Sequence, residues 1–217
     1  MSTYAITGTN RGIGLNLVTF LAARPAGEVR FIAAAARSKS SALQRVIEQY
    51  PGRVIFVPLE VTQKESAETA VHAVEQALGA NGGIDVLINN AGVMPMTPGG
   101  VDAMSSTLGS LTLAHKYIHQ PAPAYKISKT ALNMLTRQWG IKFAQEGFTF
   151  ICIDPGWLQT DMGSQKADLP VEVGTKAVLE IIDNAKPEHN GKYLDVEVPG
   201  WAAPEKLNQY KGGELPW

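Results

Sequence analysis

A glycine-rich turn between a short strand and an amphipathic helix constrains the fold of this chain most strongly. Tyr4–Thr7 predicts a strand, Gly12–Arg24 predicts a helix, and the run Thr7–Gly14 joins them with the spacing Gly-x3-Gly-x-Gly. Glycines let a backbone turn sharply and approach a pyrophosphate, and a helix N-terminus offers N–H groups and a positive dipole end to phosphates. The placement at a strand–turn–helix junction favours dinucleotide binding over an ordinary glycine turn.

Strand and helix patterns then alternate along the chain. The further predicted strands are Val29–Ala35, Val54–Pro58, Val86–Asn89, Val101–Ser105, Phe148–Ile153 and Lys192–Val198, and the further helices are Ser66–Leu78, Tyr125–Glu146 and Val173–Asn184. This alternation predicts right-handed βαβ units and an α/β fold with a Rossmann-type, doubly wound parallel sheet. A length of 217 residues suits a single dinucleotide-binding domain over residues 1–217.

Composition excludes several classes of protein. With a net charge of −1, the chain has no basic field for nucleic acid or an anionic membrane, so neither is expected as a partner. No apolar run reaches the roughly 20 residues of a membrane span, and the first strand leaves no room for a signal peptide. The single cysteine, Cys152, is expected to be a buried core thiol, which together with these features favours a reducing, cytoplasmic location. The four histidines form no metal-ligand pattern, so no metal site is expected.

Tyr125 and Lys129 are candidates for proton transfer. They stand four residues apart in a predicted helix and therefore share a face. A nearby ammonium stabilises a phenolate and lowers the pKa of a tyrosine, which suits a general acid for carbonyl reduction or a base for the reverse reaction. The same spacing also occurs on ordinary amphipathic helices. Upstream, Ser105 and Ser106 end a predicted strand, where a hydroxyl can hydrogen-bond a substrate carbonyl.

Two further segments follow predicted strands at their carboxyl ends, where ligands bind in open α/β sheets. The first is Asn89-Asn90-Ala91-Gly92, whose small residues let a cofactor lie against the backbone. The second is Asp154–Thr160, whose backbone and terminal hydroxyl can reach a nicotinamide carboxamide.

The residues after the second predicted strand indicate which dinucleotide binds. An NAD site usually has an acid there for the ribose 2′-hydroxyl, but this chain has Ala35-Ala36-Arg37-Ser38. Arg37, together with Arg11 in the glycine turn, can hold a 2′-phosphate, whereas the plainer interpretation is two solvated arginines. The pattern favours NADP(H) over NAD(H).

The order of these motifs resembles the short-chain dehydrogenase/reductase family. TGxxxGIG, NNAG, Ser, YxxxK and PGxxxT follow one another from Thr7 to Thr160. The ending, Gly191–Asp195 and then Leu215-Pro216-Trp217, is similar to the small carbonyl-reductase branch, which includes fungal ketoreductases. The resemblance implies a small-molecule carbonyl or alcohol substrate, and it allows a homo-oligomer.

The resemblance also implies roles for individual residues. Ser106 polarises the carbonyl, Tyr125 is the acid, and Lys129 binds ribose and acts on the tyrosine. The implied cofactor-binding residues are Thr7, Gly8, Asn10, Arg11, Gly12, Ile13, Gly14, Arg37, Glu60, Val61, Asn90, Ala91, Gly92, Tyr125, Lys129, Pro155, Gly156 and Thr160. Glu60 stands where the family usually has an aspartate near adenine.

One departure from the family pattern lies between NNAG and the serine strand. The family has a full helix there, whereas this chain has only Val93–Gly100, with two prolines and two glycines. That stretch is shorter than the roughly 10–12 residues of a parallel crossover, so the helix between the fourth and fifth strands is expected to be missing. The missing part would carry the family's catalytic asparagine and a helix that often builds the oligomer interface. A shortened protein, a sequence closed up over absent residues and a mis-spliced form all stay open.

Three functions are therefore weighed. The intact set Ser106, Tyr125 and Lys129 favours an NADPH-dependent carbonyl reductase, while the short crossover favours a non-catalytic dinucleotide-binding or regulatory protein. A truncated, partly unfolded product is the third. Trp157, Trp201 and Trp217 either line a substrate pocket or pack in the core.

Overall fold

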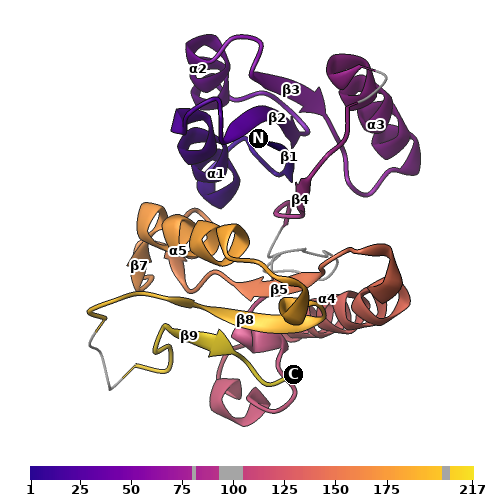
Figure 1. The fold of residues 1–217 in the computed structure, drawn as a ribbon. Coiled ribbons are helices and arrows are strands. Elements are labelled where there is room, and N and C mark those ends of the chain that lie inside the picture. The colour runs from indigo at the N-terminus through magenta and orange to yellow at the C-terminus, as the bar shows by residue number, and fades with distance from the viewer. Residues whose placement is uncertain (80–81, 93–104, 202–205) are drawn as a thin grey trace. The chain divides into compact units, whose positions relative to one another are not determined.

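The computed structural model describes residues 1–79, 82–92, 105–201 and 206–217 (Figure 1). They form two compact units, an N-terminal unit of Met1–Ala91 and a C-terminal unit of Gly92–Trp217. Each unit is described by itself. The short crossover Val93–Gly100 lies outside the described residues, as does the predicted strand that follows it, apart from Ser105.

A four-stranded parallel sheet forms the centre of the N-terminal unit. Its strands are β1 (Ser2–Thr7), β2 (Val29–Ala36), β3 (Val54–Pro58) and β4 (Val86–Ile88), in the order β3-β2-β1-β4. Its helices are α1 (Gly12–Ala23), α2 (Ser41–Gln49) and α3 (Lys64–Leu78). Because every strand pair is parallel, the carboxyl ends of β1, β2 and β4 meet at one edge, where Thr7 pairs with Ala35 and Ile6 with Ile88.

Both faces of this sheet are covered by helices. Phe31, Ala33 and Ala35 form a buried cluster with Val57 and with Ala70 of α3. The side chains between them on β2 point to the other face, and these residues are also buried. Figure 1 shows α1 and α2 on one side of the sheet and α3 on the other. This arrangement leaves the strand ends open to carry a site.

The C-terminal unit has a separate three-stranded sheet in the order β5-β8-β9. Its strands are β5 (Ile151–Asp154), β8 (Lys192–Glu197) and β9 (Lys211–Glu214), and β6 (Leu158–Gln159) pairs with β7 (Leu169–Pro170). Its long helices are α4 (Pro123–Lys142) and α5 (Val171–Asp183). Short 3-10 helices are η1 (Thr107–Gly109), η2 (Ala114–Tyr117), η3 (Ala144–Glu146) and η4 (Pro187–His189).

The α4 side of β5 carries a polar row of side chains. Cys152 of β5 lies within 3.0 Å of the Thr136 hydroxyl on α4, which fixes this side of the strand. Asp154, two residues on, therefore points the same way, and β8 pairs Tyr193 with Cys152 and Asp195 with Asp154. Two carboxylates thus lie side by side on neighbouring parallel strands.

The predicted α/β fold of Rossmann type is confirmed, with differences in the elements. Helix α2 and the short strands β6, β7 and β9 were not predicted. The helix predicted over Tyr125–Glu146 starts at Pro123 and ends at Lys142, and the strand predicted from Phe148 starts at Ile151. No helix among the described residues is long and apolar enough to cross a membrane. The single domain over residues 1–217 stays a prediction.

Candidate functional site

The glycine loop, Gly8–Gly14, is built so that only glycine fits at its two ends. Gly8 has φ +71° and Gly12 has φ +55°, both in the left-handed region. A Cβ on Gly14 would lie 2.3 Å from the carbonyl oxygen of Gly8, and a Cβ on Gly8 would lie 2.7 Å from the Cα of Ala91. The loop therefore folds back on itself and presents backbone at its surface.

The NNAG segment is fixed to the end of β1 by four hydrogen bonds. The Asn90 side-chain amide donates to the carbonyl oxygens of Thr7 at 2.9 Å and Gly8 at 3.2 Å. In return, the Thr7 hydroxyl accepts the backbone N–H groups of Asn90 at 3.1 Å and Ala91 at 2.9 Å. The structure thus brings together two segments that the sequence assigned to the cofactor.

Helix α1 starts in this loop without a side-chain cap. Its N-cap residue, Arg11, makes no side-chain cap bond, and the first turn carries no acidic residue. Such a terminus leaves N–H groups and the positive dipole end for an anion. The glycine cradle and the uncapped helix together fit the pyrophosphate of a dinucleotide.

Ser40 supports the glycine loop and was not predicted as a site residue. Its hydroxyl donates to the Asn10 carbonyl at 2.7 Å and caps α2 by accepting the Leu43 N–H at 3.2 Å. The available signal was a serine in front of the amphipathic stretch Ser41–Gln49.

Arg37 and Glu60 face each other at the ends of β2 and β3. The Arg37 Nε lies 4.0 Å from a Glu60 carboxylate oxygen, and the arginine side chain is 69% exposed. The pKa of Glu60 is lowered, chiefly by the hydrogen bond from the Thr62 hydroxyl, with the Thr62 N–H and Arg37 adding to it. An arginine this exposed has donors left for a second anion. Val61 beside Glu60 is also exposed.

In the C-terminal unit, α4 places Tyr125 and Lys129 on one face. The Lys129 ammonium nitrogen lies 5.0 Å from the centre of the Tyr125 ring, although Lys129 is buried. Gly109 of η1 packs against this point, since a Cβ there would lie 2.6 Å from the Lys129 Cβ. The Thr130 hydroxyl donates to the Gly109 carbonyl at 2.9 Å and so holds η1 against the helix.

The two serines in front of η1 differ in accessibility. Ser105 is buried, and its hydroxyl donates to the side-chain oxygen of Asn133 on α4. Ser106 is half-buried, and its hydroxyl accepts the Leu108 N–H at 3.3 Å. Ser106 is therefore the serine with a hydroxyl that a ligand can reach, and Ser105 serves the packing of η1 on α4.

The segment after β5 turns at Gly156, which has φ +83°. The Thr160 hydroxyl accepts the Gly163 N–H at 3.0 Å and closes the next turn. The Tyr210 hydroxyl accepts the Trp157 N–H at 3.2 Å and donates to Asp168 at 2.9 Å. These bonds hold the chain around Tyr210 against the predicted carboxamide-binding segment.

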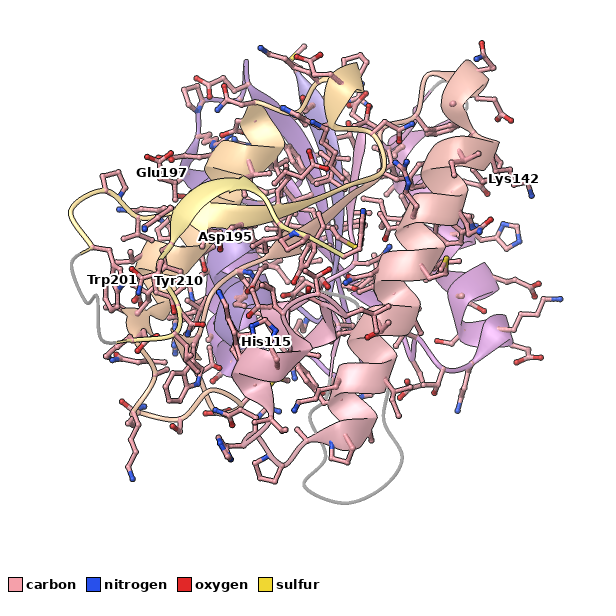
Figure 2. The ribbon with its side chains drawn as sticks, turned by 90° about the horizontal axis from the view of Figure 1, so that it is seen from below. His115, Lys142, Asp195, Glu197, Trp201 and Tyr210 are labelled. Carbon is pink, nitrogen blue, oxygen red and sulfur yellow. The ribbon has the colours of Figure 1, made fainter. Side chains whose placement is uncertain are left out.

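The tryptophans divide between surface and packing roles. Trp157 is 43% exposed. Trp201 lies edge-on to Tyr210 with 5.2 Å between the ring centres, and Figure 2 shows the two residues next to each other. Trp217 stacks on Tyr193 at 5.5 Å, so it packs against the buried tyrosine of β8. Of the three, Trp157 is the best placed to meet a ligand.

Asp154 was not predicted as a site residue, yet it contacts two predicted segments. Its carboxylate accepts the Thr107 N–H at 2.7 Å and the Gly156 N–H at 2.9 Å. Burial raises the pKa of Asp154, while the two N–H donors and the Lys129 ammonium oppose this rise. The signal in the sequence was an aspartate directly before Pro155-Gly156 at a strand end.

Asp195 and Cys152 flank Asp154 on the same polar row. Burial, followed by the neighbouring Asp154 carboxylate, raises the pKa of Asp195 to about 7. Asp154 and Asp195 both line a cavity of about 200 Å³ together with Tyr117 and Tyr210. Burial also raises the pKa of the Cys152 thiol to about 11, in keeping with the expected core thiol. Among the described residues, no group of three or more His, Cys, Asp or Glu is placed to hold a metal ion.

The predicted site residues thus fall into two groups, one in each unit. The first contains the glycine loop, Arg37, Glu60 and the NNAG segment up to Ala91, whereas Gly92 begins the second unit. The second contains Ser106, Tyr125, Lys129 and the Pro155–Thr160 segment.

Comparison with known proteins assigns the chain to a family of oxidoreductases. The short chain dehydrogenase model matches residues 2–112, and the chain belongs to this family. The C-signal protein of Myxococcus xanthus is 38% identical over 96 residues, which cover 44% of this chain and 49% of that protein. An uncharacterized oxidoreductase of Schizosaccharomyces pombe is 29% identical, over 88% of this chain and 93% of the relative.

A solved structure extends the match beyond the region of the family model. The NADPH-bound carbonyl reductase from chicken fatty liver superposes with a TM-score of 0.79 at 26% identity, covering 93% of this chain and 99% of that chain. The chain therefore has the fold of the carbonyl reductases in this family.

Proposed function

We propose that this protein is an NADP(H)-dependent oxidoreductase that reduces the carbonyl group of a small molecule to an alcohol, or catalyses the reverse reaction. The observation that carries the proposal is the buried Lys129 ammonium, 5.0 Å from the Tyr125 ring. A bound nicotinamide dinucleotide supplies or accepts the hydride. The glycine loop and the NNAG segment hold the dinucleotide. Their backbones lie so close together that a Cβ on Gly8 or Gly14 would clash, and this leaves bare backbone for the ligand to approach.

The side chains of the second group carry out the proton chemistry. Lys129 stabilises the Tyr125 phenolate as the phenol gives its proton to the carbonyl oxygen. Ser106 donates a hydrogen bond to the same oxygen as negative charge develops there. Pro155, Gly156 and Thr160 are proposed to hold the carboxamide.

The preference for NADP(H) rests on Arg37 and on one relative. The arginine side chain is 69% exposed at the end of β2, where a ribose phosphate is expected. The Glu60 carboxylate oxygen is as far as 4.0 Å from the Arg37 Nε, so this ion pair is a loose one. The structural relative from chicken fatty liver was solved with NADPH. An arginine suits a 2′-phosphate because its planar fork gives two charge-assisted hydrogen bonds.

One observation favours the non-catalytic alternative. The alignment with the S. pombe relative spans 241 positions, more than the 217 residues of this chain, so the relative has residues that this chain lacks. If these include the helix that usually precedes the serine strand, the chain could bind a dinucleotide without turnover.

A single set of measurements tests the proposal against both alternatives. The purified protein is titrated with NADPH by fluorescence, and the absorbance of NADPH is then followed with a panel of aldehydes, ketones and diketones. Oxidation of NADPH that depends on the carbonyl supports the reductase. Binding without oxidation across the panel supports the non-catalytic protein, and no binding together with a missing cooperative unfolding transition supports the truncated product. A cytoplasmic location and a homo-oligomer also stay proposals.

A further inference from the structure

We propose that Asp154 is a positioning residue that locks the serine turn and the Pro155-Gly156 turn into one fixed arrangement, an inference that rests on the proposed carbonyl reduction. Asp154 acts through the backbone of the two segments, to which its carboxylate is hydrogen-bonded.

The contacts are made with the peptide groups next to the site residues. One carboxylate oxygen accepts the N–H of Thr107, which belongs to the peptide that joins Ser106 to Thr107. The other oxygen accepts the N–H of Gly156, which belongs to the peptide that joins Pro155 to Gly156. Each bond therefore fixes the plane of one peptide, and with it the direction of the neighbouring site residue.

Only a short carboxylate meets both requirements at this position. Asp154 is 5% exposed, so neither N–H can turn to bulk water if the acceptor is lost. An asparagine of the same size offers one oxygen, and its NH2 group would face the second N–H donor. Replacing Asp154 by Asn therefore frees one of the two turns while it leaves the space filled.

Opposing effects act on the ionisation of Asp154. Burial raises the pKa of its carboxyl, and the N–H donors of Gly156 and Thr107 and the Lys129 ammonium on α4 reduce this rise without cancelling it. Asp195 on β8, the register partner of Asp154, places a second carboxyl beside it. Figure 2 shows Asp195 near Tyr210, and both residues line the cavity together with Asp154.

Asp195 offers a matched control. It lies on the neighbouring strand, faces the same cavity and takes the same substitution, but the N–H groups of Thr107 and Gly156 are both bonded to Asp154. Asp195→Asn therefore reproduces the loss of one carboxylate from the polar row without freeing the serine turn.

The test compares Asp154→Asn and Asp195→Asn with the unchanged protein. The rate of carbonyl reduction is measured at saturating NADPH and expressed per NADPH-binding site, so that unfolded protein does not count. A misplaced serine turn or carboxamide segment lowers kcat of Asp154→Asn by about 10- to 100-fold, while its Kd for NADPH changes less than about threefold, because the glycine loop and Arg37, which are proposed to hold the phosphates, are untouched. Asp195→Asn keeps kcat within about twofold.

Hydrogen–deuterium exchange gives a second readout that does not need activity. The Thr107 and Gly156 amides are protected in the unchanged protein, and at least one of them exchanges about tenfold faster in Asp154→Asn while the amides of α4 keep their rates. If the unchanged protein reduces no carbonyl but the exchange at these amides rises, the proposed function fails and the positioning contact stands. Unchanged exchange at both amides, or a kcat loss of the same size in Asp195→Asn, overturns the proposal.

Discussion

The ammonium of the buried Lys129 lies 5.0 Å from the centre of the Tyr125 ring, and Tyr125 stands one helical turn earlier in α4. A buried ammonium beside a phenol stabilises the phenolate, which supports the proposal that Tyr125 is the proton donor. Gly109 of η1 packs so closely on this point that a Cβ on it would lie 2.6 Å from the Lys129 Cβ, so a larger residue there would push the lysine away.

Removing the phenol hydroxyl is the direct test of this pair. Tyr125→Phe keeps the ring over which Lys129 lies and removes only the transferable proton. We expect the rate of carbonyl reduction to fall by about 10²- to 10⁴-fold, the range of a general acid, with little change in NADPH affinity. Steady-state kinetics and NADPH titration measure the two effects. Tyr50→Phe, at a half-buried tyrosine of the N-terminal unit, is the control, and substantial activity in Tyr125→Phe would remove Tyr125 from its role.

The features that sequence predicted well are those fixed by local pattern. The strand, the glycine loop and the helix α1 follow one another within 23 residues. The helical periodicity predicts Ile13, Leu17, Val18 and Leu21 on one face, and the last three of these are buried. Their geometry depends on residue types that stand next to each other in the chain. The NNAG segment was also predicted, because its residues follow a predicted strand, and in the structure that strand pairs with β1.

Other features depend on contacts that no local pattern reveals. The role of Asp154 rests on a hydrogen bond to a residue 47 positions away, so the sequence showed only an aspartate at a strand end. The strand predicted from Phe148 starts later because Phe148 and Phe150 pack with Phe143 in an aromatic cluster at the end of α4. The periodicity of Ser66–Leu78 predicts an inward face made of Ala70, Val71, Val74 and Leu78. Ala70, Val74 and Leu78 do pack against the cluster on β2, but Val71 is 55% exposed.

The glycine loop predicts a severe effect of one added methyl group. In Gly14→Ala the new Cβ would lie 2.3 Å from the Gly8 carbonyl oxygen, so the loop or the NNAG segment has to move. We expect NADPH affinity to fall by at least about tenfold and the free energy of unfolding to fall by roughly 1–3 kcal/mol. Fluorescence titration and urea unfolding measure these changes. In the control Gly27→Ala the new Cβ meets nothing within 4 Å. Equal losses of NADPH affinity and stability in both variants would contradict the close packing proposed for the glycine loop.

Arg37 is expected to set the preference between the two dinucleotides. The unchanged protein should bind NADPH more tightly than NADH, and Arg37→Asp should weaken NADPH by about 10- to 100-fold while NADH changes little, because a charge-assisted contact to the 2′-phosphate is lost. Parallel titrations with both dinucleotides measure the ratio. Arg30→Asp, at an exposed arginine of the same strand, changes the net charge equally and should leave the ratio unchanged. Tighter or equal binding of NADH by the unchanged protein would exclude the preference.

Asp195 makes the stability of the C-terminal unit depend on pH. Its folded-state pKa is raised from 3.8 to about 7, first by burial and then by the Asp154 carboxylate, so the folded protein holds a proton that the unfolded chain releases. The free energy of unfolding therefore falls as the pH rises from about 4 to about 7, and the loss is complete above that range.

Asp195→Asn has no carboxyl group to ionise and escapes this loss. After allowance for solvent screening of a half-buried side chain, the variant should be more stable than the unchanged protein by roughly 1–2 kcal/mol at pH 8. At pH 4.5, where the carboxyl of the folded protein is neutral and close to an amide in shape, the two should unfold at nearly the same urea concentration. Urea unfolding of both proteins at the two pH values measures the difference. A stability gap that is the same at pH 4.5 and pH 8 would mean that the ionisation of Asp195 is not its cause.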